Sequence, residues 1–424
     1  MLLFARFLYS LILLILMPLA CFYLYVLRGR KNPGYRQDFG ERFGFTDASG
    51  DIILHCASVG EVLATLPLIK ALLADKHQYR LVISTNTPTG REQINQLLAK
   101  DIAAARVQVC YLPFDLPLAQ RRFIRRSGAR LLAVIETELW PNLLHRAKRA
   151  GLNTLIINAR LSEKSAQGYA RVAPLTRSIL SDIDRLACHH QADGERFINL
   201  GLDKDRLEVT GSIKFDIDVS EQQATQAKQL KASLGQTPIW IAGSTHPGEP
   251  ELLLGAHEQV RKSYPDALLI IAPRHPEQFD KVAEQLTAQG MNFSRRRKGE
   301  HQGEAVLLAD TLGELTMLYG AADVAFIGGS LIERGGHNPL EACAHGIPVL
   351  SGQHTFNFDH VYPALIDQGG ALWVDEHNLV DTLNSLFSEP QKRADMGACG
   401  LKVVQQNQGA INKTLALIEE QINA

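Results

Sequence analysis

The sequence predicts two doubly wound α/β domains that follow an N-terminal membrane helix. Three observations carry this prediction. The chain has 424 residues, 46% of them hydrophobic, and single cores rarely grow beyond roughly 250 to 300 residues. Short β-rich runs alternate with longer helical patterns after residue 50, which is typical of βαβ units and parallel sheets. A long apolar run without charge stands near the N-terminus.

The apolar run FLYSLILLILMPLACFYLYVL, from Phe7 to Leu27, has 21 residues and is long enough to cross ~30 Å of hydrocarbon. A cleaved signal peptide is the alternative, but it needs small residues before the cleavage site. Phe22, Tyr23 and Tyr25 stand there instead. We therefore expect residues 1–28 to form a membrane anchor.

Basic residues are distributed unequally about this run, since only Arg6 precedes it. The positive-inside rule then places the body of the protein in the cytoplasm, at the inner membrane. Aromatic residues among the bases favour contact with an anionic lipid surface. The bases that follow the run are Arg28, Arg30, Lys31, Arg36 and Arg42, and the aromatic residues are Tyr35, Phe39, Phe43 and Phe45.

Charge and cysteine content exclude several classes of protein. Lys and Arg total 44 against 45 for Asp and Glu, so the chain has no overall charge that would attract nucleic acid. The six cysteines are far apart without a CxxC pair, which argues against a disulfide framework or a zinc ribbon. Adjacent His189 and His190 cannot easily chelate one metal. These features suit a reducing compartment.

The elements after the anchor form two series, which join near residues 211–223. Each series predicts one parallel sheet, and ligands bind such sheets at the carboxyl ends of the strands. The first series of β-rich runs covers 51–57, 80–86, 107–113, 130–136, 153–159, 185–190 and 206–212, and the second covers 238–244, 267–273, 305–310, 324–329, 347–352 and 371–375.

The end of the first run carries a carboxylate, Glu61, in the stretch LHCASVGEV (54–62). A predicted strand ends there and a predicted helix begins. Gly60 before the carboxylate and the helix N-terminus should expose the side chain and keep it ionised near neutral pH. A plain first-turn helix acid is the alternative reading.

Small and basic residues follow strands of the second series. Gly243, Ser244 and Thr245 precede a predicted helix and suit an anion at its N-terminus, although an ordinary capped helix fits equally and no Walker A loop is present. Arg274, after Pro273, can hold a phosphate or stack on a base, or can simply be solvated.

Two helix starts add further candidates. Thr311 and Glu314 have capping-box spacing, and the amides near Leu312 and Gly313 lie at the end of the domain where a ligand binds. In FIGGSLIERGGHNPLEACAHGIPVL (326–350) two glycine pairs permit close backbone approach. Glu341 can accept two ribose hydroxyls, or it can complement the helix dipole.

At this point the chain resembles the GT-B glycosyltransferases, in which two Rossmann-like domains face a cleft. It further resembles the 3-deoxy-D-manno-oct-2-ulosonic acid (Kdo) transferases of lipopolysaccharide and lipid A synthesis. The resemblance covers nearly the whole chain. The motifs that carry it are ASVGE, TNTPTG, YLPFDLP, ETELWPNLL, NARLSEKSAQGY, GSIKFD, PRHPE, GGSLIERGGHNPLEA and FNF.

The resemblance implies an inverting transfer of Kdo from CMP-Kdo to a tetra-acylated lipid A precursor, lipid IVA. It implies Glu61 as the catalytic base and supporting catalytic roles for Glu136 and Lys214. Glu138 is an alternative to Glu136, since both would face the same side of a strand. The implied donor-binding residues are Ser244, Pro273, Arg274, Leu312, Gly313, Glu314, Gly329, Ser330, Asn338, Pro339, Leu340 and Glu341.

The resemblance also gives each segment a task. Residues 1–28 would anchor the chain, 29–215 would bind the acceptor and 216–424 would bind CMP-Kdo. No Asp-x-Asp motif is present, so we expect no metal and no cofactor. The same fold also supports nucleotide-sugar epimerases and other lipid-directed glycosyltransferases, and a non-catalytic lipid-binding protein is the third hypothesis.

Overall fold

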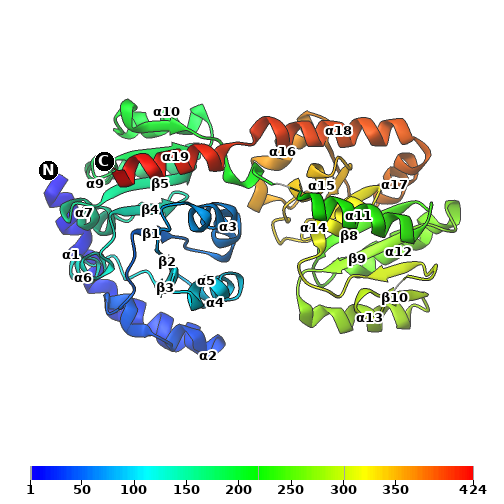
Figure 1. Cartoon of the computed structure of the whole chain (residues 1–424), viewed down its shortest axis with the longest axis horizontal. Coiled ribbons are helices and arrows are strands. Elements are labelled where there is room, and N and C mark those ends of the chain that lie inside the picture. Colours follow the sequence, from blue (N-terminus) through cyan, green and yellow to red (C-terminus); the bar gives the residue numbers. More distant parts are fainter. Residues whose placement is uncertain (1, 218, 300, 424) are drawn as a thin grey trace. The chain divides into compact units, whose positions relative to one another are not determined.

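The computed structural model describes residues 2–217, 219–299 and 301–423 as two compact units. The first unit comprises Met1–Lys214 and Gln408–Ala424, and the second comprises Phe215–Asn407. Each unit contains one seven-stranded parallel sheet with helices on both faces (Figure 1). The predicted fold class, two Rossmann-like α/β domains, is confirmed.

The first sheet has the order β3-β2-β1-β4-β5-β6-β7, and every predicted run of the first series contributes one strand. Leu54 on β1 lies opposite Ile83 on one neighbouring strand and Ala133 on the other. The strands are β1 (Ile52–His55), β2 (Leu81–Thr85), β3 (Val107–Tyr111), β4 (Leu131–Ile135), β5 (Asn153–Ala159), β6 (Arg185–Cys188) and β7 (Leu207–Val209).

Alternate residues of these strands enter different cores. Ile53 packs on the side of α6, α7, α9 and α10, whereas Leu54 packs on the side of α3, α4 and α19. Continuous apolar strands are therefore required. The helices are α3 (Val59–Ala74), α4 (Pro88–Leu97), α5 (Ala99–Ala103), α6 (Pro117–Ser127), α7 (Pro141–Arg149), α8 (Glu163–Arg171), α9 (Ala173–Ser181), α10 (Gln191–Leu200) and α19 (Ala410–Asn423).

The second domain was predicted to cover residues 216–424, but α19 belongs to the first unit, so the second unit ends at Asn407. Ile418 is fully buried in the core of the first unit, and Asn153 Nδ2 donates to the Gln421 carbonyl at 2.6 Å. Arg185 pairs with Glu420 at 2.7 Å. The chain therefore returns to the first sheet at its end because that sheet would otherwise leave apolar surface uncovered.

The second sheet has the order β10-β11-β9-β8-β12-β13-β14. Its edge strand β10 is absent from the predicted series, because a short basic stretch carries no apolar signal. The strands are β8 (Ile239–Thr245), β9 (Leu268–Pro273), β10 (Phe293–Arg295), β11 (Val306–Leu308), β12 (Val324–Ile327), β13 (Val349–Ser351) and β14 (Ala371–Trp373).

Helices flank this second sheet as they flank the first. The central strand β8 is buried along its whole length, with Trp240 facing one core and Ile241 the other. The helices are α11 (Glu221–Leu234), α12 (Glu249–Ser263), α13 (Phe279–Ala288), α14 (Leu315–Ala321), α15 (Leu340–Ala344), α16 (Val361–Asp367), α17 (Leu379–Ser388) and α18 (Pro390–Asn407).

The N-terminal apolar run forms α1 (Leu2–Phe22), which continues through a π-helical turn (Tyr23–Arg28) into α2 (Gly29–Lys31). By length and composition this continuous helix is able to cross a membrane. It belongs to the first unit and lies against α7 and α9 (Figure 1).

Candidate active site

Glu61 lies where β1 passes into α3, on the first turn of the helix. Its carboxylate accepts hydrogen bonds from the Ala57 amide at 2.8 Å and from the Ser58 hydroxyl at 2.9 Å. Ser58 is the N-cap residue, and its Oγ accepts from the Glu61 amide at 3.3 Å. The carboxylate is therefore held in one orientation by the helix start itself.

The environment of Glu61 differs from the expected one. The residue is only 8% exposed. Burial raises the pKa of Glu61 to about 7, the negative charge of Glu136 adds to the rise, and the hydrogen bonds from Ala57 and Ser58 oppose it. The expectation of an exposed carboxylate that is fully ionised at neutral pH is wrong, because desolvation outweighs the helix N-terminus. A carboxyl with this pKa is suited to exchange a proton near neutral pH.

Glu136 follows β4, the neighbour of β1, and has a left-handed backbone with φ of 59°. A non-glycine residue in this region costs about 1–3 kcal/mol, and such strain gathers at functional sites. Its carboxylate lies 3.5 Å from the ammonium of Lys214. The structure thus brings two of the predicted catalytic residues together, and the Glu136 charge also acts on Glu61.

Glu138 makes different contacts from Glu136, although the charges of both acids raise the pKa of Glu61. The strand ends at Ile135, so the two acids are not on one strand face as the sequence suggested. Trp140 Nε1 donates to the Glu138 carboxylate at 2.8 Å, and burial raises the pKa of Glu138. Glu138 is therefore tied to its own loop, and Glu136 is the acid that meets Lys214.

Asn158 holds the segment that carries Lys214, a role that the sequence did not predict. It is buried with φ of 59°, and its Oδ1 accepts from the Ile213 amide at 3.1 Å and from His189 Nε2 at 2.7 Å. The amide oxygen can only accept, so His189 carries its proton on Nε2. The available sequence signal was an asparagine directly after the apolar residues 155–157, since asparagine tolerates a left-handed backbone better than most residues.

In the second unit the amides of the glycine loop after β12 are already bonded. The carboxylate of Glu249 is fully buried and accepts from the amides of Gly329 at 2.7 Å, Ser330 at 3.1 Å and Leu331 at 3.2 Å. It also accepts from the His246 amide at 2.9 Å. Glu249 thus fills the anion-binding nest that a ligand would otherwise occupy.

These hydrogen bonds to Glu249 change the role expected of two predicted donor-binding residues, Gly329 and Ser330. The amides of Gly329 and Ser330 bind Glu249, and the Ser330 hydroxyl donates to the Ile327 carbonyl at 2.5 Å. Ser330 is fully buried. In the structure their contacts hold the loop to the start of α12.

Two histidines from different loops meet beside Gly329. The Nε2 atoms of His246 and His337 are 2.8 Å apart, and the rings are parallel within 2°. Burial lowers the pKa of His337 to about 3, and the charge of Arg274 contributes. Ser244, one residue before the end of β8, has a φ of 57° and is 7% exposed.

Glu341 lies on the first turn of α15, as predicted. Thr316 of α14 donates its hydroxyl to Glu341 Oε2 at 2.6 Å. Burial raises the pKa of Glu341, and the positive charge of Arg274 opposes that rise. Leu340 is fully buried, and its amide donates to Asn338 Oδ1 at 3.1 Å, so these two residues shape the helix start after Pro339.

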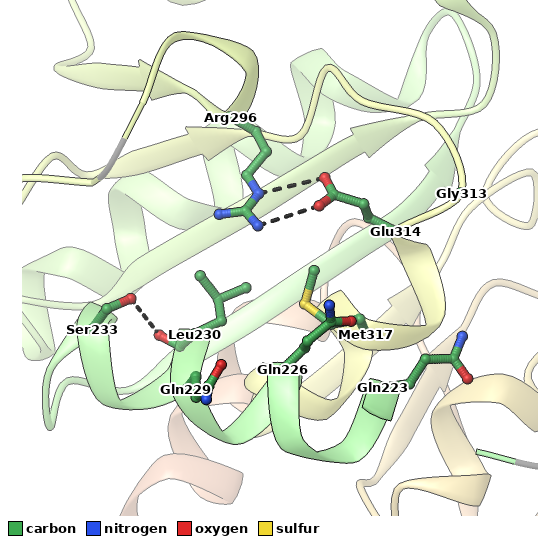
Figure 2. Close-up of a pocket in the computed structure, with 9 residues that line it drawn as sticks. All are labelled: Gln223, Gln226, Gln229, Leu230, Ser233, Arg296, Gly313, Glu314 and Met317. Atoms are coloured by element: carbon green, nitrogen blue, oxygen red, sulfur yellow. Dashed lines mark hydrogen bonds and ion pairs between the residues drawn. The ribbon is translucent and has the colours of Figure 1, made fainter. Parts of the chain in front are cut away.

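Two of the predicted donor residues, Gly313 and Glu314, border a cavity of about 370 Å³ (Figure 2). Glu314 does not complete a capping box with Thr311, because α14 begins after it, at Leu315. Its carboxylate instead pairs with Arg296 at 3.2 Å and accepts from the Thr311 hydroxyl. Leu312 is 71% exposed. The lining residues are Gln223, Gln226, Gln229, Leu230, Ser233, Arg296, Gly313, Glu314 and Met317.

Among the residues that the structure describes, no group of three or more His, Cys, Asp or Glu side chains is placed to hold a metal ion. The titratable and charged side chains placed near the described strand ends include the carboxyls of Glu61 and Glu136, the ammonium of Lys214, the ring of His246 and the exposed guanidinium of Arg274.

Comparison with known proteins links this geometry to one family. Residues 37–217 match the family model described as 3-deoxy-D-manno-octulosonic-acid transferase (kdotransferase). The chain is 37% identical to a 3-deoxy-D-manno-octulosonic acid transferase of Haemophilus influenzae, with 98% of each chain covered. It is 34% identical to a protein of the same name from Bordetella pertussis, with 97% of this chain and 98% of that chain covered.

A solved structure shares the fold. UDP-GlcNAc 2-epimerase from Neisseria meningitidis, bound to UDP-GlcNAc, superposes with a TM-score of 0.56 at 14% identity, covering 87% of this chain and all of that chain. At this identity the similarity shows the fold of two Rossmann-like domains and nothing of the reaction.

Proposed function

Because this chain belongs to the 3-deoxy-D-manno-octulosonic acid transferase family of glycosyltransferases, we propose that it moves Kdo from CMP-Kdo to the lipid A precursor lipid IVA in lipopolysaccharide synthesis. Transfer inverts the anomeric configuration. The observation that carries the mechanism is the buried Glu61 carboxyl, whose pKa is about 7 and whose orientation is set by Ser58 and Ala57.

In the proposed step a hydroxyl oxygen of the acceptor sugar attacks the anomeric carbon of Kdo. Its proton passes to Glu61 while the bond from that carbon to the phosphate oxygen of CMP breaks on the opposite face. CMP leaves with the electron pair. A single general base is sufficient for such a displacement, and a pKa near the working pH favours both protonation states that the cycle needs.

The pair of Glu136 and Lys214 supports this step electrostatically. The Lys214 ammonium supplies a positive charge for the Kdo carboxylate or the departing phosphate. The Glu136 carboxylate, 3.5 Å from that ammonium, holds it in place. Glu136 also raises the pKa of Glu61 by its negative charge. The pair therefore acts on both the charge of the substrate and the basicity of Glu61.

The second unit binds the donor. Glu341 accepts the ribose hydroxyls, and Arg274 and Ser244 bind the phosphate, since the amides of Gly329 and Ser330 already bind Glu249. Gly313 and Glu314, beside the cavity in Figure 2, bind the nucleotide through their backbone, as does the exposed Leu312. Pro273, Asn338, Pro339 and Leu340 shape the loops that hold these groups.

The protein works at the cytoplasmic face of the inner membrane. The apolar helix of Leu2–Lys31 and the basic residues that follow it support contact with an anionic membrane surface, and the acceptor is a lipid that stays in the bilayer. The first unit, which carries Glu61, binds that acceptor.

The experiment that tests this function incubates purified protein with CMP-Kdo, generated in situ, and lipid IVA in the presence of EDTA. We expect the lipid mass to increase by one or more Kdo units and CMP to be released. The Glu61→Gln variant should leave the lipid unchanged, whereas Glu195→Gln, an exposed acid on α10, should behave as wild type. Consumption of UDP-sugars with no gain in lipid mass would refute the proposed donor.

A further inference from the structure

The apolar helix α1 is fastened to the first unit by polar contacts near its start. The guanidinium of Arg6 lies 3.4 Å from the Asp182 carboxylate and 3.2 Å from the Ser178 hydroxyl. The Tyr9 hydroxyl donates to Asp115 at 3.1 Å. These partners belong to α9 and to the loop before α6, so the beginning of α1 is part of the domain surface.

A second contact lies one residue further along. Asn142 Nδ2 donates to the Ser10 hydroxyl at 3.0 Å, and the Asn142 amide donates to Asp115 at 2.9 Å. Asp115 is 6% exposed and also accepts from the Leu143 amide at 2.8 Å, which caps α7. Tyr9 and Ser10 therefore join a buried network that holds the start of α7.

Contact with the domain follows one stripe of the helix. Half-buried residues recur every three or four positions, at the spacing of a single helix face. The other faces carry large exposed apolar side chains, including Leu3 at 74% and Ile15 at 67% exposure. The half-buried positions along the stripe are Arg6, Ser10, Leu13, Met17, Ala20 and Leu24.

The far end of the helix is fastened to the same unit. Tyr111 of β3 donates its hydroxyl to the Gly34 carbonyl at 3.3 Å and its amide to the Glu41 carboxylate at 2.8 Å. From Arg6 to Lys31 an unbroken helix is ~37 Å long at ~1.5 Å per residue, which exceeds a hydrocarbon core of ~30 Å. One folded unit therefore holds both ends of a helix that is longer than the membrane core is thick.

From these contacts we propose that α1 lies along one leaflet of an anionic phospholipid bilayer and does not cross it. Its exposed apolar face enters the acyl chains of that leaflet, and residues 2–10 stay on the same side of the membrane as the two catalytic units. The helix needs no polar face of its own, since the domain lies along its remaining stripe.

Charge favours a lipid leaflet as the occupant of the apolar face. At the end of the helix Arg28 lies over the ring of Tyr23 and Arg36 over that of Tyr25, both at 5.6 Å. Amphipathic rings beside cations are typical of the headgroup level of an anionic leaflet. A second copy of the chain would place these like charges against each other.

A spanning helix is incompatible with the contacts at its start. It would carry Arg6 to the opposite interface and leave Asp182 behind, or it would draw α7 with Arg146, Lys148 and Arg149 into the hydrocarbon. The two arrangements place residues 2–10 on opposite sides of the membrane, so one experiment separates them.

The test uses a Leu3→Cys variant in which the two partly exposed cysteines, Cys21 and Cys399, are replaced by alanine. Intact spheroplasts are treated with a membrane-impermeant maleimide. We expect no labelling until the membrane is broken, as for a Gln191→Cys control on the first unit. Labelling of Leu3→Cys in intact spheroplasts, while Gln191→Cys stays unlabelled, would overturn the proposal.

Two further readouts do not depend on sidedness. In native membranes a short bifunctional maleimide should join Arg6→Cys to Asp182→Cys, whereas Arg6→Cys with Glu195→Cys should stay unlinked. A fluorophore on Ile15→Cys should be quenched by lipids labelled near the headgroup more than by lipids labelled at the bilayer centre. Strongest quenching at the centre, or disulfide dimers through Ile15→Cys, would overturn the proposal in favour of a spanning helix or a second copy.

Discussion

The hydrogen bond from the Ser58 hydroxyl lowers the pKa of Glu61, and removing it should move the pH dependence of the reaction. Ser58 Oγ donates to the Glu61 carboxylate at 2.9 Å and so stabilises its ionised form. A hydrogen bond to a charged group contributes about 1.5–3 kcal/mol, and one pKa unit corresponds to about 1.4 kcal/mol. Taking the lower end of that range, about one unit, Ser58→Ala should raise the pKa of Glu61 from about 7 to about 8.

The direction follows from which protonation state is the base. Catalysis needs ionised Glu61, so kcat/KM should increase with pH and level off above the pKa of Glu61 in free enzyme. At pH 7 about half of wild-type Glu61 is ionised, against about a tenth in the variant, a difference of about 5-fold in kcat/KM. At pH 9 the two enzymes should differ by no more than about 10%.

The assay is the rate of Kdo transfer to lipid, measured from pH 5.5 to pH 9.5 for both enzymes. Ser58 is also a helix N-cap, whose loss costs about 1 kcal/mol of stability. Ser220→Ala, which removes the N-cap of α11 in the second unit, controls for that cost and should leave the pH profile unchanged. An equal loss of rate at every pH in Ser58→Ala would refute the link between Ser58 and the basicity of Glu61.

Three further predictions concern charge and packing. Lys214→Met should lower kcat by about 100-fold with little change in KM, because a cation acting on the transition state is lost. The control Lys231→Met on α11 should leave kcat unchanged, and an equal fall in kcat for both variants would contradict the role of Lys214. Glu249→Ala should destabilise the second unit by about 3 kcal/mol in chemical unfolding, since buried amides lose their acceptor, and Glu251→Ala should change it by less than about 0.5 kcal/mol. Ile418→Ala should destabilise the first unit by about 2–5 kcal/mol, seen as faster hydrogen exchange in β5; unchanged exchange would show that α19 adds nothing to that core.

The strands were predictable because parallel sheets buried on both faces need continuous apolar runs, and both series have them. The exception, β10, has three residues with two basic or polar side chains, so its place at the sheet edge comes from pairing with β11. The sequence also did not predict that α19 returns to the first sheet. Its apolar residues indicate a helix, but they do not indicate which of the two cores the helix packs against.

The site was predictable where one segment contains the whole arrangement. Ser58, Gly60 and Glu61 form a local helix start, so the position of Glu61 follows from the sequence. Its raised pKa comes mainly from burial, with a contribution from Glu136, which is distant in the chain, so it does not follow from the local sequence. Glu249 was visible as a first-turn acid. Its bonds to the amides near Gly329 join segments about 80 residues apart, and no local pattern reports such a contact.

The most direct test of the central claim is the single-turnover rate of Kdo transfer from CMP-Kdo to lipid IVA across pH, for wild type and Glu61→Gln. If Glu61 is the base, wild type should show an acid limb near pH 7, and the variant should be slower by about 100-fold to 10,000-fold without that limb. A variant that keeps more than about a tenth of the wild-type rate, with the same limb, would contradict the account.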